Sequence, residues 1–383
     1  MAQMSDVQFM RRALRLAKRG LGHTSPNPMV GAVLVKSGKV IGQGWHHRAG
    51  QPHAEIEALN HARRQDISPR GATLYVTLEP CCTQGRTPPC TEAIRAAGIK
   101  RVVVGATDPN PRHVGKGLTI LKRAGIEVVP DILSDDCTAL NQAFNHWIVH
   151  RTPLVTVKAA MTLDGKIATA SGESKWITGE QARAHGMRLR AASDAILVGV
   201  NTVLADDPSL TVRQQIADGR WKIGRPLRRI ILDSMARTPL NAKVASDAQA
   251  GLTTIIVSEN APRRRVAALA KRASILVVPQ IEQDPVSRPS TLLDLKFLLH
   301  KLGSENVTSL LVEGGGEVNA SFLSCGFAQR VAFFYAPKIL GGRDSIKGVG
   351  GAGVRSLDEA LQLRDVRWRT LGEDLLLTAR VAI

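Results

Sequence analysis

The hydrophobic positions of the chain follow two alternating periods, one helical and one extended. An opening helix is predicted between a capping residue, Ser5, and a terminating Gly20. Its apolar positions repeat at helical spacing: Phe9, Met10, Ala13, Leu16 and Ala17. Apolar runs at 30–36 and 40–44 then flank a short Ser-Gly-Lys turn, which predicts a β-hairpin.

Strands and helices alternate through the remainder of residues 1–151. The run 72–78 is rich in β-branched and apolar residues, so it predicts a buried strand. A helix is predicted to begin at His53, and another at the two prolines 88–89. Further elements are a strand at 101–106, a helix at 117–124, a strand at 126–130 and a helix at 134–148. This order predicts an α/β sandwich.

The pattern restarts after residue 151, so we expect a second domain at 152–383. Its first strand is predicted at 154–160, and Thr178 with Gln181 forms a capping box for the helix that follows. Further buried strands are predicted at 195–200, 229–233, 253–257, 274–279, 309–313, 331–336 and 375–381. Helical segments between several of them indicate a larger α/β domain with a mostly parallel sheet.

One histidine, one carboxylate and two cysteines stand in an order typical of a catalytic zinc site. His53, Cys81 and Cys90 offer three ligands, whereas a structural zinc site uses four. Glu55 is not needed as a ligand and can shuttle protons, as a non-ligating glutamate does in zinc deaminases. Cys90 stands near a predicted helix N-terminus, which favours a thiolate. The competing interpretation is a closed structural site with Cys82, which the opposite directions of adjacent side chains on an extended backbone disfavour.

Composition limits the partners and the location. The formal net charge of +18 favours anionic partners, either nucleic acid or phosphorylated metabolites. Aromatic residues make up only 4%, which leaves little for base stacking, so we expect no nucleic acid. We see no long apolar stretch or signal-peptide pattern and expect no membrane association and a cytoplasmic location. Five cysteines fit a reducing compartment, with Cys137 and Cys325 as buried thiols.

Two glycine clusters in the second domain suggest a dinucleotide site, with unequal weight. Residues 348–353 match G-x-G-x-x-G but follow no clear strand, so we interpret them as a loop. Residues 309–316 read as a strand that runs into glycines and then a helix, where free backbone N–H groups can hold a pyrophosphate. A tight turn that simply needs glycine remains the alternative.

Four motifs in residues 1–151 make this half similar to a known family. They are PNPMVGAV at 26–33, HAE at 53–55, GRTPPC at 85–90 and DPNP at 108–111. They resemble the deaminase half of the bifunctional riboflavin-biosynthesis deaminase–reductases. The spacing of the two cysteines is wider than the short Pro-Cys-x-x-Cys of many nucleoside deaminases. Cys82-Thr83 departs from the Ser-His that members of the family often carry.

Residues 152–383 resemble the reductase half of the same family. The motifs are KAAMTLDGK at 158–166, GESKWIT at 172–178 and TVLADDPSLTVR at 202–213. The resemblance implies an α/β fold class, a cytidine-deaminase-like α/β/α sandwich followed by a dihydrofolate-reductase-like α/β domain. It also implies one zinc per chain and NADPH as cofactors.

The resemblance assigns the remaining site residues. In the deaminase pocket it implies substrate contacts at Asn27, His46, Arg86, Asp108 and Asn110. NADPH would lie against Ala160, Trp176, Thr202, Asp206, Ser234 and the segment Gly315, Gly316, Glu317, Val318, Asn319, Ala320 and Ser321. The second substrate would contact Lys158, Ser174, Arg190, Leu210, Arg213 and Glu313, with its phosphate on the arginines. Plain alternatives are surface roles for His46 and Asp108, a core role for Leu210 and a solvated helix face for Arg190.

The implied activity has two steps. Zinc-dependent hydrolytic deamination of 2,5-diamino-6-(5-phosphoribosylamino)pyrimidin-4(3H)-one comes first. NADPH-dependent reduction of the ribosyl side chain follows and gives 5-amino-6-(5-phosphoribitylamino)uracil. The expected partners are these small molecules and further copies of the chain in a homo-oligomer. The alternatives are a zinc tRNA or nucleoside deaminase with an RNA-binding C-terminal domain, and a zinc-stabilised binding protein, in which Glu55 would have no catalytic purpose.

Overall fold

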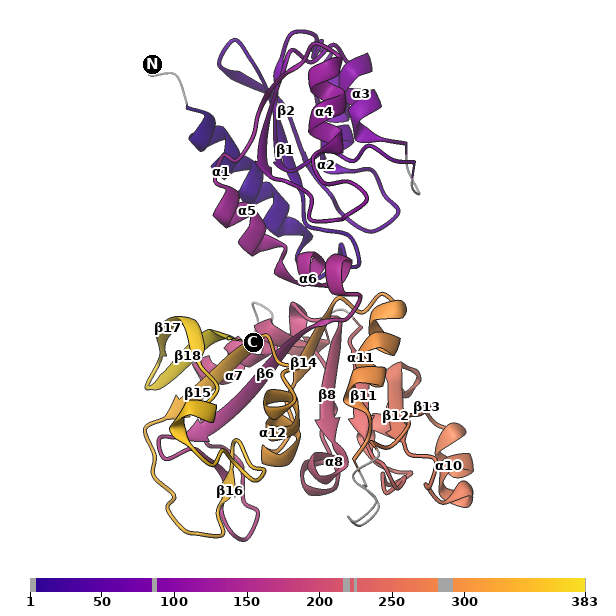
Figure 1. Ribbon diagram of the computed structural model, residues 1–383, viewed down its shortest axis with the longest axis vertical. Coiled ribbons are helices and arrows are strands. Elements are labelled where there is room, and N and C mark those ends of the chain that lie inside the picture. The colour runs from indigo at the N-terminus through magenta and orange to yellow at the C-terminus, as the bar shows by residue number, and fades with distance from the viewer. Residues whose placement is uncertain (1–4, 85–87, 216–220, 224–225, 282–291, 383) are drawn as a thin grey trace. The chain divides into compact units, whose positions relative to one another are not determined.

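Two compact units divide the chain, Met1–Arg151 and Thr152–Ile383. The computed structural model describes residues 5–84, 88–215, 221–223, 226–281 and 292–382 (Figure 1). None of the helices in these ranges is long and apolar enough to cross a membrane.

The N-terminal unit is built on a five-stranded sheet in the order β2-β1-β3-β4-β5. Its strands are β1 (Gly31–Lys36), β2 (Lys39–Trp45), β3 (Thr73–Leu78), β4 (Arg101–Ala106) and β5 (Glu127–Val129). The hairpin and the pairing of β1 with β3 are antiparallel, whereas β3, β4 and β5 run parallel. The carboxyl ends of β3 and β4 therefore meet at one edge, where ligand sites of α/β sheets commonly form.

Helices cover both faces of this sheet (Figure 1). They are α1 (Asp6–Ala17), α2 (Ala54–Arg63), α3 (Cys90–Ala96), α4 (Lys116–Arg123), α5 (Ser134–Leu140) and α6 (Gln142–His150). A side chain at Gly31 would strike the backbone of Ala13 in α1, and one at Gly42 would strike the backbone of Ala58 in α2. Glycine at these two positions therefore lets a helix approach each face of the hairpin.

The expected helix at 134–148 is two helices, which corrects the sequence prediction. Asn141 separates α5 from α6 and its side chain is buried. Its Oδ1 accepts from Met29 N at 2.8 Å and its Nδ2 donates to Met29 O at 2.9 Å. This pairing ties the break between the two helices to a distant backbone, and the sequence periodicity carries no sign of it.

The C-terminal unit is built on a nine-stranded sheet in the order β13-β12-β11-β8-β14-β6-β15-β18-β17. All pairs from β13 to β15 are parallel and only those with β18 are antiparallel, which confirms the mostly parallel prediction. The sheet strands are β6 (Leu154–Thr162), β8 (Ala195–Gly199), β11 (Arg228–Leu232), β12 (Thr253–Val257), β13 (Ser274–Val277), β14 (Ser309–Val312), β15 (Arg330–Ala336), β17 (Leu363–Leu371) and β18 (Asp374–Val381). Two small pairs are β7 (Lys166–Ala168) with β16 (Ile346–Lys347) and β9 (Arg213–Gln215) with β10 (Trp221–Ile223).

Alternate residues of the parallel strands feed separate cores. Leu197 and Val157 belong to a cluster with residues of α11 and α12, whereas Val198 joins Leu269 of α10 in another cluster. The helices of this unit are α7 (Glu180–Ala191), α8 (Val200–Asp206), α9 (Lys243–Ser246), α10 (Arg263–Ala270), α11 (Leu295–Ser304) and α12 (Gly316–Ser324). Because both faces of the parallel strands are covered, these strands read as continuous apolar runs.

Two local predictions for this unit are wrong, and one strand was missed. The N-cap of α7 is Gly179 rather than Thr178, and the Gly179 N–H donates to Asp374 Oδ2 on distant β18 at 2.8 Å. Cys325 is exposed just past the end of α12, although Cys137 in the other unit is buried as expected. Strand β17 was not predicted, because eight of its nine residues are exposed and so lack an apolar alternation.

Candidate functional site

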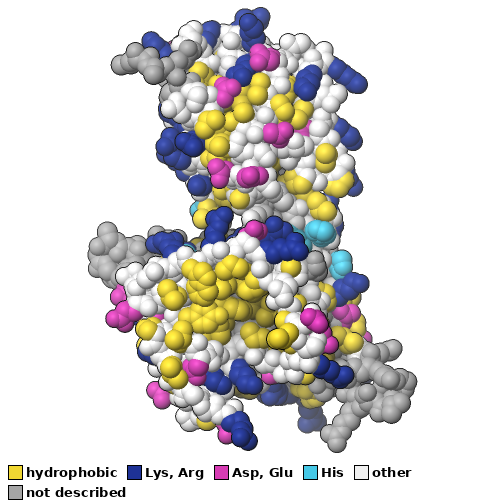
Figure 2. All heavy atoms as spheres, turned by 60° about the vertical axis from the view of Figure 1, so that its left-hand side comes forward, with side chains coloured by type: hydrophobic (Ala, Val, Ile, Leu, Met, Phe, Trp, Pro, Cys, Tyr) yellow, Lys and Arg dark blue, Asp and Glu magenta, His cyan; other side chains and the backbone are white. Residues whose placement is uncertain are grey.

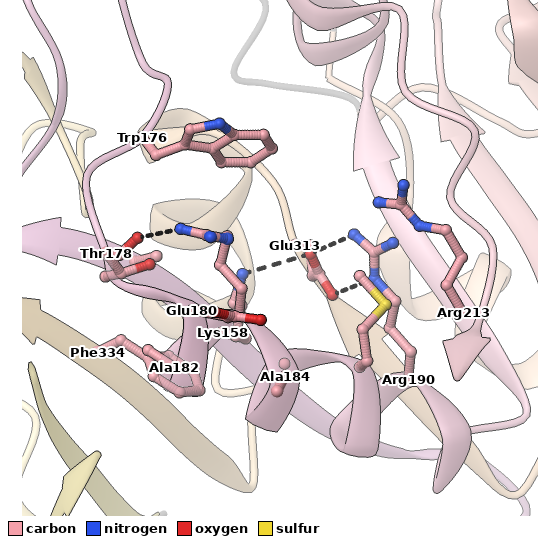
Figure 3. Close-up of a pocket in the computed structure, with 14 residues that line it drawn as sticks. Lys158, Trp176, Thr178, Glu180, Ala182, Ala184, Arg190, Arg213, Glu313 and Phe334 are labelled. Carbon is pink, nitrogen blue, oxygen red and sulfur yellow. Dashed lines mark hydrogen bonds and ion pairs between the residues drawn. The ribbon is translucent and has the colours of Figure 1, made fainter. Parts of the chain in front are cut away.

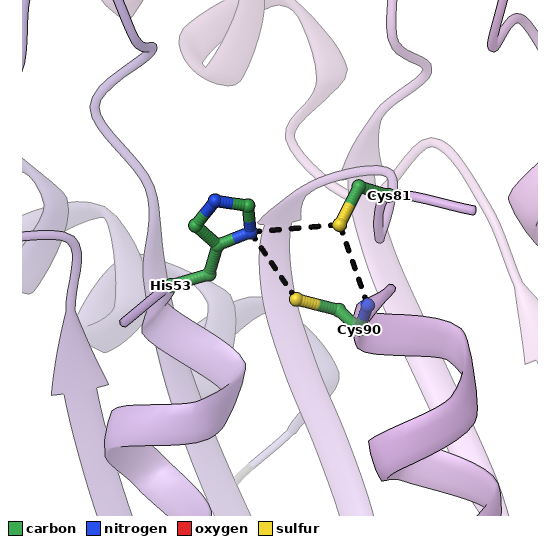
Figure 4. A group of neighbouring side chains, drawn as sticks. All are labelled: His53, Cys81 and Cys90. Carbon is green, nitrogen blue, oxygen red and sulfur yellow. Dashed lines mark hydrogen bonds between the residues drawn. The ribbon is translucent and has the colours of Figure 1, made fainter. Parts of the chain in front are cut away.

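The three predicted zinc ligands come together at the edge of the N-terminal sheet (Figure 4). His53 is the N-cap residue of α2, Cys81 follows β3, and Cys90 is the first residue of α3. Their ligand atoms all lie within 4.8 Å of one another, and His53 Nδ1 is 3.5 Å from Cys81 Sγ and 3.3 Å from Cys90 Sγ. One imidazole nitrogen and two sulfurs are a donor set that suits zinc, and three protein ligands leave a fourth position for water.

The fourth polar group of this site is the Glu55 carboxyl, which lies in the first turn of α2. The side chain is 3% exposed, and burial beside Cys81 raises its pKa to about 7. Hydrogen bonds from Cys90 and from His53 lower the pKa of Cys81 to about 4. One sulfur is therefore a thiolate at neutral pH, and Glu55 can both take up and release a proton near neutrality.

Cys82 does not join the metal cluster. Among the described residues the cluster contains only His53, Cys81 and Cys90, while Cys82 Sγ lies 3.9 Å from His113 Nδ1. The same histidine ring contacts Thr83 Oγ1 through Nε2 at 3.2 Å. The geometry therefore favours an open, three-ligand site over the closed alternative.

Polar side chains of the deaminase-like pocket lie close to the cluster. His46 and Asp108 are 2% and 8% exposed, so the surface alternative is wrong for both. Asn27 Nδ2 donates to His46 Nε2 at 3.1 Å, while His46 Nδ1 donates to the Pro52 carbonyl at 3.0 Å. The His46 ring lies 5.3 Å from the His53 ring. Burial lowers the pKa of His46, which favours a neutral imidazole at pH 7.

Glu79, which the sequence analysis missed, organises the loop that carries Asp108 and Asn110. Its buried carboxylate accepts from four backbone N–H groups of residues 108, 115, 117 and 118, at 3.1, 3.0, 2.8 and 3.4 Å. Asp108 Oδ1 in turn accepts from Asn110 N at 2.9 Å. The expected contact residue Arg86 lies outside the described residues. The sequence signal that could have pointed to Glu79 is its position at the end of the predicted buried strand 72–78, directly before Pro80-Cys81.

Most of the predicted NADPH residues lie along the carboxyl ends of four neighbouring parallel strands. Ala160 lies near the end of β6, and Ser234 follows β11. Thr202 and Asp206 lie in α8, directly after β8, and residues 315–321 follow β14 into α12. Trp176 reaches the same region from the loop before α7, and its side chain is exposed. Dinucleotides bind at this edge of α/β sheets.

The two glycine clusters, which the sequence weighed separately, are in contact. Gly350 N donates to the Gly316 carbonyl at 2.9 Å, and Asn319 Nδ2 donates to the Gly348 carbonyl at 2.8 Å. Residues 348–353 form a loop, as predicted. Gly315, the N-cap of α12, has open space where a side chain would lie, so a ligand can approach the backbone at this point.

A pocket of about 370 Å³ lies over α7 and the end of β6 (Figure 3). Glu313 lies between Lys158 and Arg190, with Oε1 2.8 Å from Arg190 Nε and Oε2 3.4 Å from Lys158 Nζ. Burial would raise the pKa of Glu313, but the charges of Arg190 and Lys158 hold it at about 2. Arg190 is therefore an ion-paired pocket residue, and the solvated-face alternative is wrong.

The other predicted substrate residues divide into pocket and core. Arg213 lines the pocket. Leu210 is 3% exposed and belongs to the hydrophobic core, which agrees with the alternative of a core role. Ser174 Oγ donates to Asp206 Oδ1 at 3.2 Å, which joins an expected substrate residue to an expected NADPH residue. Buried Arg229 holds the carbonyl of Ser209, directly before Leu210, at 2.9 Å.

The pocket also contains residues that the sequence analysis missed. They are Thr178, Glu180, Ala182, Arg183, Ala184, Gly186, Met187 and Phe334. Arg183 and Arg190 are seven residues apart on α7 and so share a helix face. That spacing was visible in the sequence, but only the packing of α7 reveals that this face lines a pocket.

Fold and sites together define a two-domain enzyme with a zinc-dependent deaminase unit and a separate reductase unit. Residues 3–106 match the family model "Cytidine and deoxycytidylate deaminase zinc-binding region", and residues 153–377 match "RibD C-terminal domain". The chain belongs to the RibD family of bifunctional deaminase–reductases of riboflavin biosynthesis. Zinc and NADPH are the cofactors of the two domains.

Relatives cover nearly the whole chain. The riboflavin biosynthesis protein RibD of Actinobacillus pleuropneumoniae is 44% identical, over 98% of this chain and 95% of the relative. That of Escherichia coli is 39% identical, over 98% and 99%. The solved structure of Acinetobacter baumannii RibD superposes with a TM-score of 0.82 at 38% identity and covers 99% of each chain. The C-terminal unit thus matches a reductase domain.

Proposed function

We propose that residues 1–151 remove the 2-amino group of 2,5-diamino-6-(5-phosphoribosylamino)pyrimidin-4(3H)-one as ammonia. Residues 152–383 then reduce the ribosyl side chain of the product to give 5-amino-6-(5-phosphoribitylamino)uracil. A Thermotoga maritima protein with 34% identity and a TM-score of 0.79 is titled a diaminohydroxyphosphoribosylaminopyrimidine deaminase and 5-amino-6-(5-phosphoribosylamino)uracil reductase. The observation that carries the proposal is the three-ligand cluster with a buried, unused glutamate beside it.

In the deamination, His53, Cys81 and Cys90 would hold zinc, which activates water at neutral pH. Glu55 takes a proton from the water and delivers it to the departing amino group. Its pKa of about 7 suits both transfers. Asn27, His46, Asp108 and Asn110, together with Arg86, would hold the polar pyrimidine and its phosphoribosyl group. Buried amide, imidazole and carboxyl groups of this kind orient a ligand by hydrogen bonds.

In the reduction, NADPH would supply a hydride from a site formed by Ala160, Trp176, Thr202, Asp206, Ser234 and residues 315–321. The hydride would go to the ribosyl carbon, which would release the ring oxygen, and a residue of the pocket would have to give that oxygen a proton. With a pKa of about 2, Glu313 is ionised at neutral pH and has no proton to give. Asp206 is ion-paired with Lys175 and accepts a hydrogen bond from Ser174, so it has no proton to give either. Lys158 therefore remains as the candidate donor, because it lines the pocket beside Glu313.

The phosphate of the second substrate would bind mainly to Arg213. Arg190 already uses Nε and Nη2 on Glu313 and Nη1 on the Thr211 carbonyl. Among the described residues Arg213 has no acidic partner, so its guanidinium can bind phosphate at two points. Lys158 lines the same pocket as Arg213 and as Ala160 of the expected NADPH site.

Single substitutions in each unit test the proposal. Glu55→Gln keeps size and polarity but cannot accept the water proton, so deamination should fall by about 10²–10⁴-fold while zinc is retained. The same variant should still oxidise NADPH when given the deaminated pyrimidine. Arg213→Ala should show the reverse, with weak reduction and normal ammonia release. Loss of both activities in a folded, zinc-loaded Glu55→Gln protein would contradict the proposal.

We further propose that the enzyme is a cytoplasmic homo-oligomer and does not bind nucleic acid. Hydrophobic side chains gather over the part of the C-terminal unit where β15, β17 and β18 lie (Figure 2). The strand register puts Phe333 and Trp368 opposite Leu377, and Tyr335 opposite Leu375. Trp368 and Leu375 are 59% and 40% exposed, which suggests that a second copy covers this face. Light scattering on Trp368→Glu should then give a smaller mass than wild type.

A further inference from the structure

Arg183 is a pocket residue to which neither the sequence nor the family resemblance assigns a role. It lies in the first turn of α7 and lines the same pocket as Lys158, Arg190 and Arg213. Its guanidinium carbon is 4.9 Å from the centroid of the Trp176 ring, and its Nη1 donates to the Thr178 carbonyl at 2.7 Å. These two contacts fix the guanidinium at the wall of the pocket and leave other N–H groups to donate to a ligand.

The charges of the pocket are divided unevenly. Lys158 and Arg190 both pair with the single carboxylate of Glu313. Within the described part of the chain, Arg183 is not paired with any carboxylate, and its guanidinium contacts a carbonyl and an aromatic ring. Arg183 is therefore a donor-only group that lacks a charge partner of its own, in a pocket built for a polar ligand.

The geometry of α7 sets the distance between the two ends of the pocket. An α-helix rises about 1.5 Å per residue, so Arg183 and Arg190 lie about 10 Å apart along the axis on one helix face. A pyrimidine joined through an amino group to a phosphorylated five-carbon sugar is also roughly 10 Å long, at about 1.5 Å per bond. Arg190 donates to the Thr211 carbonyl, two residues before Arg213, and both arginines line the pocket, so Arg190 marks the end of the pocket where Arg213 lies. A ligand with its phosphate on Arg213 would therefore present its ring to Arg183.

We infer that Arg183 recognises the ring carbonyl that deamination creates, so that the reductase pocket selects the deaminated pyrimidine. The inference rests on the proposed function. Deamination replaces an amino group, which is a donor, by a carbonyl oxygen, which is an acceptor. A guanidinium can donate to the carbonyl but has no acceptor for the amino group. The deaminated ring pairs with Arg183, whereas the original ring leaves both groups unpaired, and unpaired donors in a binding pocket disfavour the wrong ligand.

The test compares two substrates in a chain that cannot interconvert them. Glu55→Gln is introduced first, so that the 2-amino compound is not deaminated during the assay. Arg183→Gln and Arg183→Lys are added separately, and Arg188→Gln serves as a matched control, because Arg188 has the same charge on the same helix but is exposed and outside the pocket. NADPH oxidation gives kcat/KM for the deaminated pyrimidine. The 2-amino compound is scored by kcat/KM or, without turnover, by its inhibition constant. NADPH binding is titrated in every variant.

Arg183→Gln should lower kcat/KM for the deaminated pyrimidine by about 10- to 100-fold, the effect of one charge-assisted hydrogen bond. The value for the 2-amino compound should not fall, because that compound has no hydrogen bond to Arg183 to lose and the glutamine amide oxygen can accept from its amino group. The selectivity therefore falls by at least the same factor. Arg183→Lys should recover part of the loss, because an ammonium also donates. Arg188→Gln should match the parent, and the Kd for NADPH should be the same in all variants.

Three results would overturn the inference. Equal losses for both compounds would mean that Arg183 does not distinguish the carbonyl. A higher Kd for NADPH in the Arg183 variants would mean that Arg183 acts by supporting Trp176 on the cofactor side. An unchanged Arg183→Gln protein would mean that it has no role in the pocket. Failure of the parent, with Arg183 intact, to oxidise NADPH with the deaminated pyrimidine would instead contradict the proposed function itself.

Discussion

The carboxylate of Glu313 forms a bidentate ion pair with the guanidinium of Arg190, with Oε1 2.8 Å from Nε and Oε2 2.9 Å from Nη2. The two residues come from the end of β14 and the last turn of α7. The pair fixes α7 against the sheet edge and neutralises a cation that would otherwise be available to phosphate. Ion pairs of this geometry are more specific than point-charge contacts.

Acid should weaken the C-terminal unit through Glu313. Its pKa is lowered from 4.5 to about 2, so the ionised carboxylate stabilises the fold fully at pH values above the unfolded-state pKa of about 4.5. This contribution, on the order of 3 kcal/mol, should disappear as the pH falls from about 4.5 through about 2. Urea unfolding at a series of pH values would measure it. Glu313→Gln should lack this part of the acid dependence, and Glu373→Gln, an exposed control, should keep it.

Zinc content should be insensitive to Cys82. The thiol of Cys82 lies toward His113 rather than toward the metal cluster, so Cys82→Ser removes no ligand. Metal analysis should give one zinc per chain for wild type and for Cys82→Ser. Cys90→Ser is the matched control and should lose most of its metal. Marked zinc loss from Cys82→Ser would return the site to the closed, structural class.

Glu79→Gln should loosen the loop that carries Asp108. The substitution exchanges one carboxylate oxygen for an NH₂ group that faces backbone N–H donors, at a cost of about 1–3 kcal/mol. We expect a lower unfolding temperature of the N-terminal unit and a higher KM for deamination, with reduction unaffected. Exposed Glu92→Gln on α3 controls for the loss of charge. A normal KM together with lowered stability would limit Glu79 to a structural role.

The positive charge of the chain should accelerate capture of phosphorylated substrates. With a net charge of +18, kcat/KM of both reactions should fall as salt is added, because exposed charges are screened beyond about 10 Å at 0.1 M ionic strength. Reduction of the dephosphorylated pyrimidine is the control and should respond less to salt. Equal salt responses of both compounds would leave the charge without a role in substrate capture.

The sequence by itself determined most of the elements and the metal chemistry. Ser5 is the N-cap of α1, with the Gln8 side chain accepting from its N–H at 2.9 Å, because a capping box is a contact between neighbours in the chain. The parallel strands could be predicted because burial on both faces requires continuous apolar runs. The zinc ligands could be predicted because few residue types bind zinc, and because His53, Cys81 and Cys90 stand in the order of a catalytic zinc site on either side of β3.

Only the tertiary structure decided which side chains meet across the fold. Asn141 breaks a helix through bonds to Met29, and Gly179 caps α7 because Asp374 lies beside it. The partners in these pairs are 112 and 195 residues apart, beyond the reach of any local pattern. Arg183 and Arg190 share a helical face in the sequence, but packing alone pairs Arg190 with Glu313 and gives Arg183 no carboxylate partner among the described residues. Sequence periodicity fixes the face a residue occupies, whereas the charge it meets there depends on chain segments brought in by folding.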